Sequence, residues 1–151
     1  MDVSLRNKKV FVSGSSRGIG LCIARKFIEE GATVVMNSRN LAELTDAAIS
    51  LGNCNRIAGD LSNPADALAT ITKAAEILGG IDIVVCNVGS GSSVPPGQET
   101  YNEWRRVFDI NFFSATNLIE SSKAFLNESQ GSIVCISSIC GKEKNPGAPV
   151  T

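Results

Sequence analysis

Short runs of apolar and β-branched residues alternate along this chain with longer segments in which apolar residues recur every three or four positions. The short runs predict strands at residues 10–13, 33–37, 55–58, 81–87 and 131–137. The longer segments predict helices at residues 18–30, 41–50, 64–78 and 101–125. This alternation is typical of βαβ units. We therefore expect an α/β fold, a doubly wound parallel sheet with helices on both faces.

The fourth and fifth predicted strands are nearly continuous in apolar residues, as in Ile83-Val84-Val85-Cys86 and Ile133-Val134-Cys135-Ile136. Strands that are covered on both faces of a sheet lose the alternation of apolar and polar residues. The pattern of both strands therefore agrees with a parallel sheet that carries helices on both faces.

The segment between the first strand and the first helix reads Ser13-Gly14-Ser15-Ser16-Arg17-Gly18-Ile19-Gly20. Backbone N–H groups and the dipole at a helix N-terminus attract an anion. The glycines permit a tight turn, close approach of a pyrophosphate and close packing of helix on strand. The segment predicts a dinucleotide-binding site; a tight turn without a ligand is the alternative.

Composition narrows the possible functions. The length fits one dinucleotide-binding domain over residues 1–151, and a net charge of −1 argues against nucleic acid or an anionic membrane as partner. No apolar run reaches the length of a membrane span and no signal peptide opens the chain, so we expect a cytoplasmic protein. The chain has no histidine, which excludes Ser-His-Asp hydrolysis and most catalytic zinc sites, and we predict no metal site. Five cysteines without a C-x-x-C pair predict free thiols that act as small buried hydrophobic residues.

Four motifs resemble those of the short-chain dehydrogenase/reductase family. They are the spacing Gly14-x-x-x-Gly18-x-Gly20, the sequence Cys86-Asn87-Val88-Gly89, the mid-helix Asn111 and the pair Ser137-Ser138. The resemblance covers the whole chain. It implies a Rossmann-type sheet in the strand order 3-2-1-4-5-6-7, here truncated after the fifth strand and so incomplete at the C-terminus. With no sixth strand beside it, the fifth would be an unprotected edge, and we expect residues 1–151 alone to be marginally stable or to self-associate.

The resemblance also implies that the protein is an oxidoreductase. Such an enzyme would transfer hydride between a nicotinamide cofactor and a small-molecule carbonyl or secondary alcohol, and it would form a homodimer or homotetramer. Cys86 and Val88 depart from the Asn-Asn-Ala-Gly motif of the family, so only Asn87 and Gly89 are assigned to the cofactor.

The end of the second predicted strand bears on the choice of cofactor. Residues 37–40 contain no acid to bind a ribose 2′-OH, whereas Arg39 and Arg17 offer guanidinium groups to a 2′-phosphate. We therefore predict NADP(H), with NAD less favoured and two exposed surface arginines as the alternative. By resemblance Asp60 and Leu61 contact the adenine; helix capping is the alternative, for which Ser62 or Asn63 is as good a candidate. The predicted cofactor-binding residues are Gly14, Ser16, Arg17, Gly18, Ile19, Gly20, Arg39, Asp60, Leu61, Asn87 and Gly89.

Two catalytic residues follow from the resemblance. Asn111 would kink its helix and hold a water of the proton relay, and Ser138 would donate a hydrogen bond to the reacting oxygen. A solvent-facing asparagine and a loop-capping serine are the alternatives. The Tyr-x-x-x-Lys motif that follows this serine in the family is absent from residues 1–151, and the one tyrosine, Tyr101, precedes the long helix. We therefore expect residues 1–151 alone to be inactive; a catalytically inactive dinucleotide-binding module and a non-functional fragment are the alternative interpretations.

Overall fold

A parallel sheet organises the chain in the computed structural model, which describes residues 5–139 and 143. Its strands are β1 (Lys9–Val12), β2 (Thr33–Ser38), β3 (Asn55–Ala58), β4 (Ile83–Cys86) and β5 (Ser132–Cys135). They pair in parallel in the order β3-β2-β1-β4-β5. The predicted α/β fold and the predicted order of these strands are confirmed.

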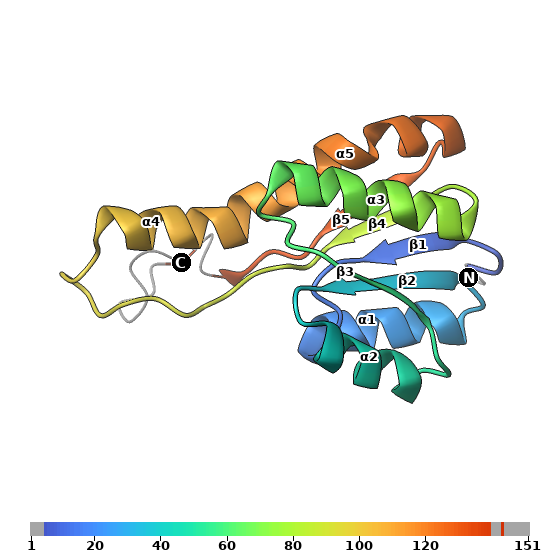
Figure 1. The fold of residues 1–151 in the computed structure, drawn as a ribbon, viewed down its shortest axis with the longest axis horizontal. Coiled ribbons are helices and arrows are strands. Elements are labelled where there is room, and N and C mark those ends of the chain that lie inside the picture. Colours follow the sequence, from blue (N-terminus) through green and yellow to red (C-terminus); the bar gives the residue numbers. More distant parts are fainter. Residues whose placement is uncertain (1–4, 140–142, 144–151) are drawn as a thin grey trace.

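Helices cover both faces of the sheet (Figure 1). Helices α1 (Gly18–Glu29) and α2 (Leu41–Ser50) lie on one face, and α3 (Pro64–Leu78) and α5 (Ser114–Ser129) lie on the other. Because successive strand residues point to opposite faces, β1 sends Phe11 into one core and Val10 and Val12 into the other. The core on the α3 and α5 face also contains Val35, Ile71, Val84, Cys86 and Leu118.

The long helix predicted at residues 101–125 is interrupted. Helix α4 (Tyr101–Phe108) is followed by a π-helical turn, η1 (Asp109–Phe113), and then by α5, which ends at Ser129. Thr100 caps α4 by accepting a hydrogen bond from the Glu103 N–H at 3.2 Å. Figure 1 shows that α4 projects beyond the sheet, together with the loop that leads to it from β4.

Exposure confirms one prediction and corrects another. β4 is largely buried, whereas every residue of β5 is exposed, because β5 is last in the strand order, as expected for the fifth strand, and only β4 pairs with it among the described strands. The cysteines also differ from their predicted burial: Cys86 is buried and Cys54 half-buried, whereas Cys22 and Cys135 are exposed. All four are free thiols, as predicted; Cys140 lies outside the described residues.

No helix within residues 5–139 is long and apolar enough to cross a membrane.

Candidate dinucleotide and catalytic site

The turn between β1 and α1 brings backbone groups unusually close together. Gly14 has a φ of +59°, a conformation that favours glycine, and a Cβ there would lie 3.2 Å from Asn87 Nδ2. At Gly20 a Cβ would lie 2.3 Å from the Gly14 carbonyl oxygen and 2.5 Å from Asn87 Nδ2. No side chain fits at Gly20 unless the turn moves, so these two glycines allow α1 to begin directly against the strand ends.

The N-terminus of α1 carries no side-chain cap. Its N-cap residue, Arg17, makes no capping hydrogen bond, and the first turn contains no acidic residue. By contrast, the side chains of Asn40, Asn63 and Thr100 cap α2, α3 and α4. The first N–H groups of α1 therefore remain available to an anionic ligand.

Asn87 ties the end of β4 to the turn after β1. Its main-chain N–H donates to Ser13 Oγ at 2.8 Å, and its Nδ2 donates to the carbonyl oxygens of Ser13 at 3.2 Å and Gly14 at 3.1 Å. The Ser13 hydroxyl in turn donates to the Val85 carbonyl oxygen at 2.9 Å. These bonds hold the glycine turn in one position relative to β4.

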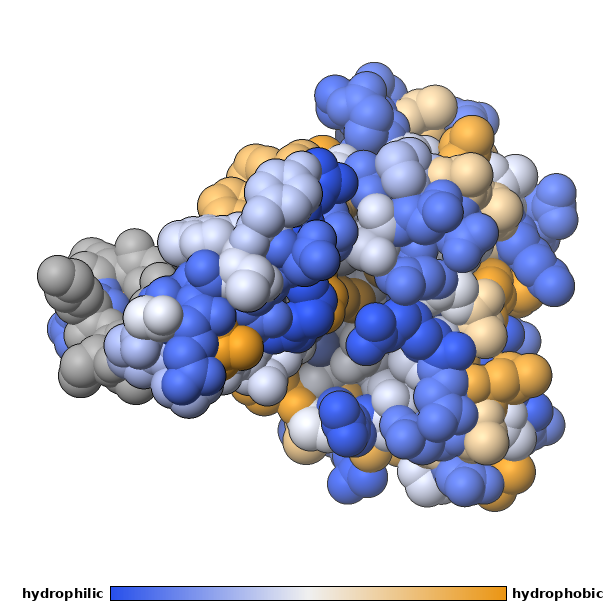
Figure 2. Space-filling view, turned by 60° about the vertical axis from the view of Figure 1, so that its left-hand side comes forward, coloured by the Kyte–Doolittle hydropathy of each residue, from blue (hydrophilic) through white to orange (hydrophobic). Residues whose placement is uncertain are grey.

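A first cavity of about 720 Å³ opens at the carboxyl ends of the central strands. Ligands in open α/β sheets bind at this edge. All the predicted cofactor-binding residues except Gly18 and Gly20 line it. Figure 2 shows mostly hydrophilic side chains around the recess between the rest of the molecule and the projecting part, which consists of α4 and the loop that leads to it from β4.

Two arginines give this cavity its unpaired positive charge. Arg17 and Arg39 are both exposed, and neither makes an ion pair or a hydrogen bond through its side chain with another described residue. The wall also contains the carboxylates of Glu43 and Asp60 and a third guanidinium, that of Arg106. Formal charges therefore leave the wall with one net positive charge.

Asp60 does not cap α3. Its Oδ1 accepts hydrogen bonds from the Ser62 N–H at 3.0 Å and the Ser62 hydroxyl at 2.7 Å. The cap is Asn63, whose Oδ1 accepts from the N–H groups of Ala65 and Asp66. Leu61 contributes to the cavity wall although only 2% of it is exposed. The capping alternative for Asp60 is wrong, and its contact with adenine stays a prediction.

A second cavity of about 570 Å³ adjoins the first. It contains both predicted catalytic residues, Asn111 from η1 and Ser138 from the segment after β5. The two cavities share the wall formed by Ile19, Asn87, Val88, Gly89 and Ser90. A ligand that extends from the glycine turn past this wall would reach both Asn111 and Ser138.

Asn111 holds the loop that follows β4. Its Oδ1 accepts from the Ser90 N–H at 2.7 Å and its Nδ2 donates to the Ser90 carbonyl oxygen at 3.1 Å. Short π-helical turns occur frequently at functional sites, and Asn111 is the middle residue of η1. Because both polar atoms of the amide are engaged with Ser90, the side chain positions the loop; the predicted role in holding a relay water stays a prediction.

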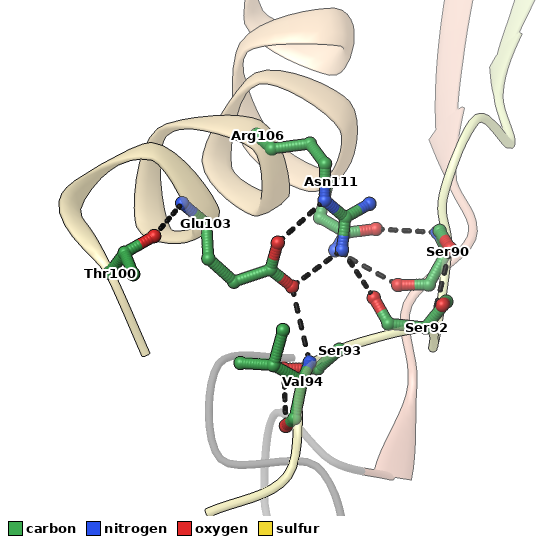
Figure 3. A network of polar contacts seen from close by, with 8 residues as sticks. All are labelled: Ser90, Ser92, Ser93, Val94, Thr100, Glu103, Arg106 and Asn111. Atoms are coloured by element: carbon green, nitrogen blue, oxygen red, sulfur yellow. Dashed lines mark hydrogen bonds and ion pairs between the residues drawn. The ribbon is translucent and has the colours of Figure 1, made fainter. Parts of the chain in front are cut away.

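An ion pair on α4 fastens the same loop further along (Figure 3). Arg106 donates to both carboxylate oxygens of Glu103, at 2.8 and 2.7 Å, and to the Ser92 carbonyl oxygen at 2.8 Å. Glu103 also accepts from the Val94 N–H at 3.3 Å. The hydrogen bonds from Arg106 lower the pKa of the Glu103 carboxyl below its usual range. Hydrogen bonds thus attach the loop to α4 and η1 at Ser90, Ser92 and Val94.

Several wall residues were not predicted from the sequence. Asn37 is 1% exposed; its Nδ2 donates to the carbonyl oxygens of Ile57 at 3.1 Å and Gly59 at 3.3 Å, and its Oδ1 has no partner among the described residues. Arg106 reaches the first cavity from a helix that lies far away in the sequence. No local sequence pattern indicates that Arg106 lines the cavity. The position of Asn37 at the end of a predicted strand could have indicated that it does.

The arrangement fits an elongated anionic ligand. The uncapped end of α1, Gly14 and the two unpaired guanidinium groups all border one cavity. These features suit a ligand that carries phosphate groups.

Comparison with known proteins identifies the family. Residues 8–150 match the family model for short chain dehydrogenase, so the chain belongs to that family, as the sequence motifs predicted. It is 36% identical over 154 residues to the uncharacterized oxidoreductase YvrD of Bacillus subtilis, covering 97% of this chain and 57% of that protein. It is 33% identical to Hydroxysteroid 11-beta-dehydrogenase 1-like protein B of Xenopus laevis, covering 98% of this chain and 52% of that protein.

Among solved structures, the fold matches an NADP active-site complex of RhlG from Pseudomonas aeruginosa. The TM-score is 0.90 at 28% identity, over 97% of this chain and 61% of that one. The chain spans little more than half the length of these relatives.

Proposed function

We propose that this protein is an NADP(H)-dependent oxidoreductase that acts on a small-molecule carbonyl or secondary alcohol. The observation that carries the proposal is the presence of Arg17 and Arg39, both unpaired, on the wall of the cavity into which the glycine turn opens. Of the relatives described above, one has a solved structure with NADP.

Each part of the cavity has a role in holding the cofactor. The N–H groups at the start of α1 would bind the pyrophosphate. Arg39 and Arg17 would form charge-assisted hydrogen bonds with the 2′-phosphate, and Asp60 and Leu61 would contact the adenine. When bound, the nicotinamide ring supplies or accepts the hydride.

The second cavity would receive the substrate. Ser138 would donate a hydrogen bond to the reacting oxygen and so orient the carbonyl. Asn111 would act through Ser90, because it fixes the loop that separates the two cavities. Together these residues bind and orient the reactants.

Reduction of a carbonyl also requires a proton donor. Tyr101 is 74% exposed at the start of α4 and lines neither cavity, and the chain has no other tyrosine and no histidine. We therefore expect residues 1–151 by themselves to bind the cofactor without turning over a substrate. The second candidate function is a dinucleotide-binding module without catalytic activity, which would use the same cofactor-binding residues.

We also propose that the protein forms a homodimer or homotetramer. The exposed rings of Trp104, Phe108 and Phe112 lie in sequence along α4 and η1, with successive centroids 6.2 and 6.4 Å apart. Their surface suits contact with a second copy.

Two measurements on the protein as its host makes it test the proposal. Calorimetric titrations with NADPH and NADH should give a lower Kd for NADPH. Consumption of NADPH should then follow addition of at least one member of a panel of aldehydes and ketones. Binding without turnover across the panel would favour the non-catalytic module, and failure to bind either dinucleotide would refute both candidates.

A further inference from the structure

A side chain of α5 holds the loop that precedes α3. Asn117 Nδ2 donates hydrogen bonds to the carbonyl oxygens of Leu61 at 3.1 Å and Ser62 at 3.2 Å. The amide group carries two N–H donors, so these two bonds use its whole donor capacity. They attach residues 60–63, called the 60–63 loop below, to a helix that lies more than 50 positions further along the chain.

The 60–63 loop forms part of the wall of the first cavity, to which it contributes Asp60, Leu61 and Ser62. Asp60 Oδ1 accepts hydrogen bonds from the N–H and the hydroxyl of Ser62. Asp60 Oδ2 makes no hydrogen bond with another described residue, so it is open to a donor on a ligand. Ser62 therefore connects the position of Asn117 to that of a carboxylate on the cavity wall.

Asn117 itself is fixed by the packing of α5. The next residue, Leu118, is 0% exposed and belongs to the core on the α3 and α5 face of the sheet. Helix α5 lies beside α3 on that face (Figure 1). Asn117 is half-buried and lines neither cavity, so it can act on a ligand only through the 60–63 loop.

We propose that Asn117 is a positioning residue for the adenine half of the cofactor, because it holds Asp60 and Leu61 where they contact the ring. This inference rests on the proposed function, since it takes the ligand of the first cavity to be an adenine dinucleotide. The amino group of adenine offers N–H donors to the open Asp60 Oδ2. Adenosine is common to NADPH and NADH, so Asn117 should affect the binding of both equally.

The effect of Asn117 should be confined to one end of the ligand. Asn111 of η1 and Asn117 of α5 lie on directly successive helical segments, yet they hold different loops. Asn111 bonds to Ser90 beside the second cavity, whereas Asn117 bonds to the 60–63 loop beside the first. Loss of the Asn117 contacts should therefore weaken cofactor binding and leave the catalytic end of the site unchanged.

The test replaces Asn117 by aspartate, which has nearly the same size but lacks both donors and places a carboxylate against two carbonyl oxygens. Asn127→Asp is the matched control, because it makes the same change of charge at an exposed residue of α5 whose side chain bonds to no other described residue. The protein as its host makes it is titrated with NADPH, NADH and adenosine 2′,5′-bisphosphate. An unfastened loop is in the binding conformation for only a fraction of the time, so we expect all three Kd values to rise roughly tenfold in Asn117→Asp alone.

Two further readouts separate positioning from a merely structural role. With a carbonyl substrate, KM for NADPH should rise in Asn117→Asp while kcat stays unchanged. Amide hydrogen exchange of the free protein should quicken in the 60–63 loop in Asn117→Asp and not in Asn127→Asp. Asn117→Ala, which removes the donors without adding a charge, should give changes in the same direction and replaces Asn117→Asp if that variant does not fold.

The outcomes distinguish this inference from the proposed function. Unchanged Kd values in a folded Asn117 variant would overturn the inference alone, even if exchange in the 60–63 loop quickened. A rise confined to NADPH would also contradict it, because the 2′-phosphate would then be the group affected. Failure of the wild-type protein to bind any of the three ligands would refute the proposed function and the inference with it.

Discussion

Replacing Arg39 by alanine should change cofactor preference more than cofactor affinity in general. The guanidinium is exposed on the wall of the first cavity and has no partner among the described residues, so its removal leaves no other charge unpaired. A hydrogen bond to a charged group contributes about 1.5–3 kcal/mol, and exposure to solvent favours the lower part of this range. A loss of about 2 kcal/mol corresponds to a roughly 30-fold increase in Kd for NADPH.

The assay compares two cofactors that differ only in the 2′-phosphate. Isothermal titration calorimetry of the wild-type and Arg39→Ala proteins with NADPH and NADH gives four Kd values. We expect the roughly 30-fold change for NADPH and a change below about twofold for NADH, because NADH lacks the group that the arginine binds. Arg25→Ala is the matched control, since Arg25 is an exposed arginine of α1 that lines neither cavity.

Two outcomes would refute this reasoning. An equal loss of affinity for both cofactors would show that Arg39 acts through the shape of the cavity, without contact to the 2′-phosphate. Unchanged affinity for NADPH would mean that the 2′-phosphate lies elsewhere. Salt gives a further check, because the difference between the two proteins should shrink as ionic strength rises.

Three further predictions concern the parts that build the site. Gly20→Ala should lower the free energy of unfolding by about 1–3 kcal/mol and weaken dinucleotide binding, because its Cβ would lie 2.3 Å from a carbonyl oxygen. Gly91 has open space around it, so Gly91→Ala should leave both the melting temperature and the Kd for the dinucleotide unchanged in thermal melts and titrations. Asn111→Ala should speed amide hydrogen exchange in the loop after β4, whereas Asn127→Ala on α5 should leave it unchanged. Glu103→Gln should lower Tm at neutral pH, because it removes the ion pair with Arg106. The folded pKa of Glu103 lies below its ordinary value of 4.5. The difference in Tm between the two proteins should therefore persist at pH 4.5 and vanish only as pH falls through the folded pKa.

Local signals predicted α3 and the glycine turn well. The helix runs from Pro64 to Leu78 as expected, because Asn63 caps its start and Gly79 ends it with a φ of +69°. Caps of this kind act within a few residues, so they can be read from a short stretch of sequence. The glycine turn was predicted on the same basis, and Gly14 and Gly20 make the close contacts that glycine alone permits.

The state of β5 could not be predicted from its composition. Its apolar run resembles that of β4, yet β4 is largely buried and β5 is exposed. Burial of a strand depends on which strands and helices lie beside it, and that is a property of the topology. The same limitation applies to Cys22 and Cys135, which the sequence placed among buried hydrophobic residues.

The sequence by itself determined the order of strands and helices along the chain, the glycine turn and membership of the family, because each depends on residues close together in the chain. Tertiary structure alone decided which distant residues share the site. Asn111 bonds to Ser90 across 21 positions, and Cys86 faces Cys135 only because β4 and β5 pair in one register. The physical reason is that a parallel sheet gathers the carboxyl ends of separate strands at one edge, so residues far apart in sequence become neighbours when the strands pair.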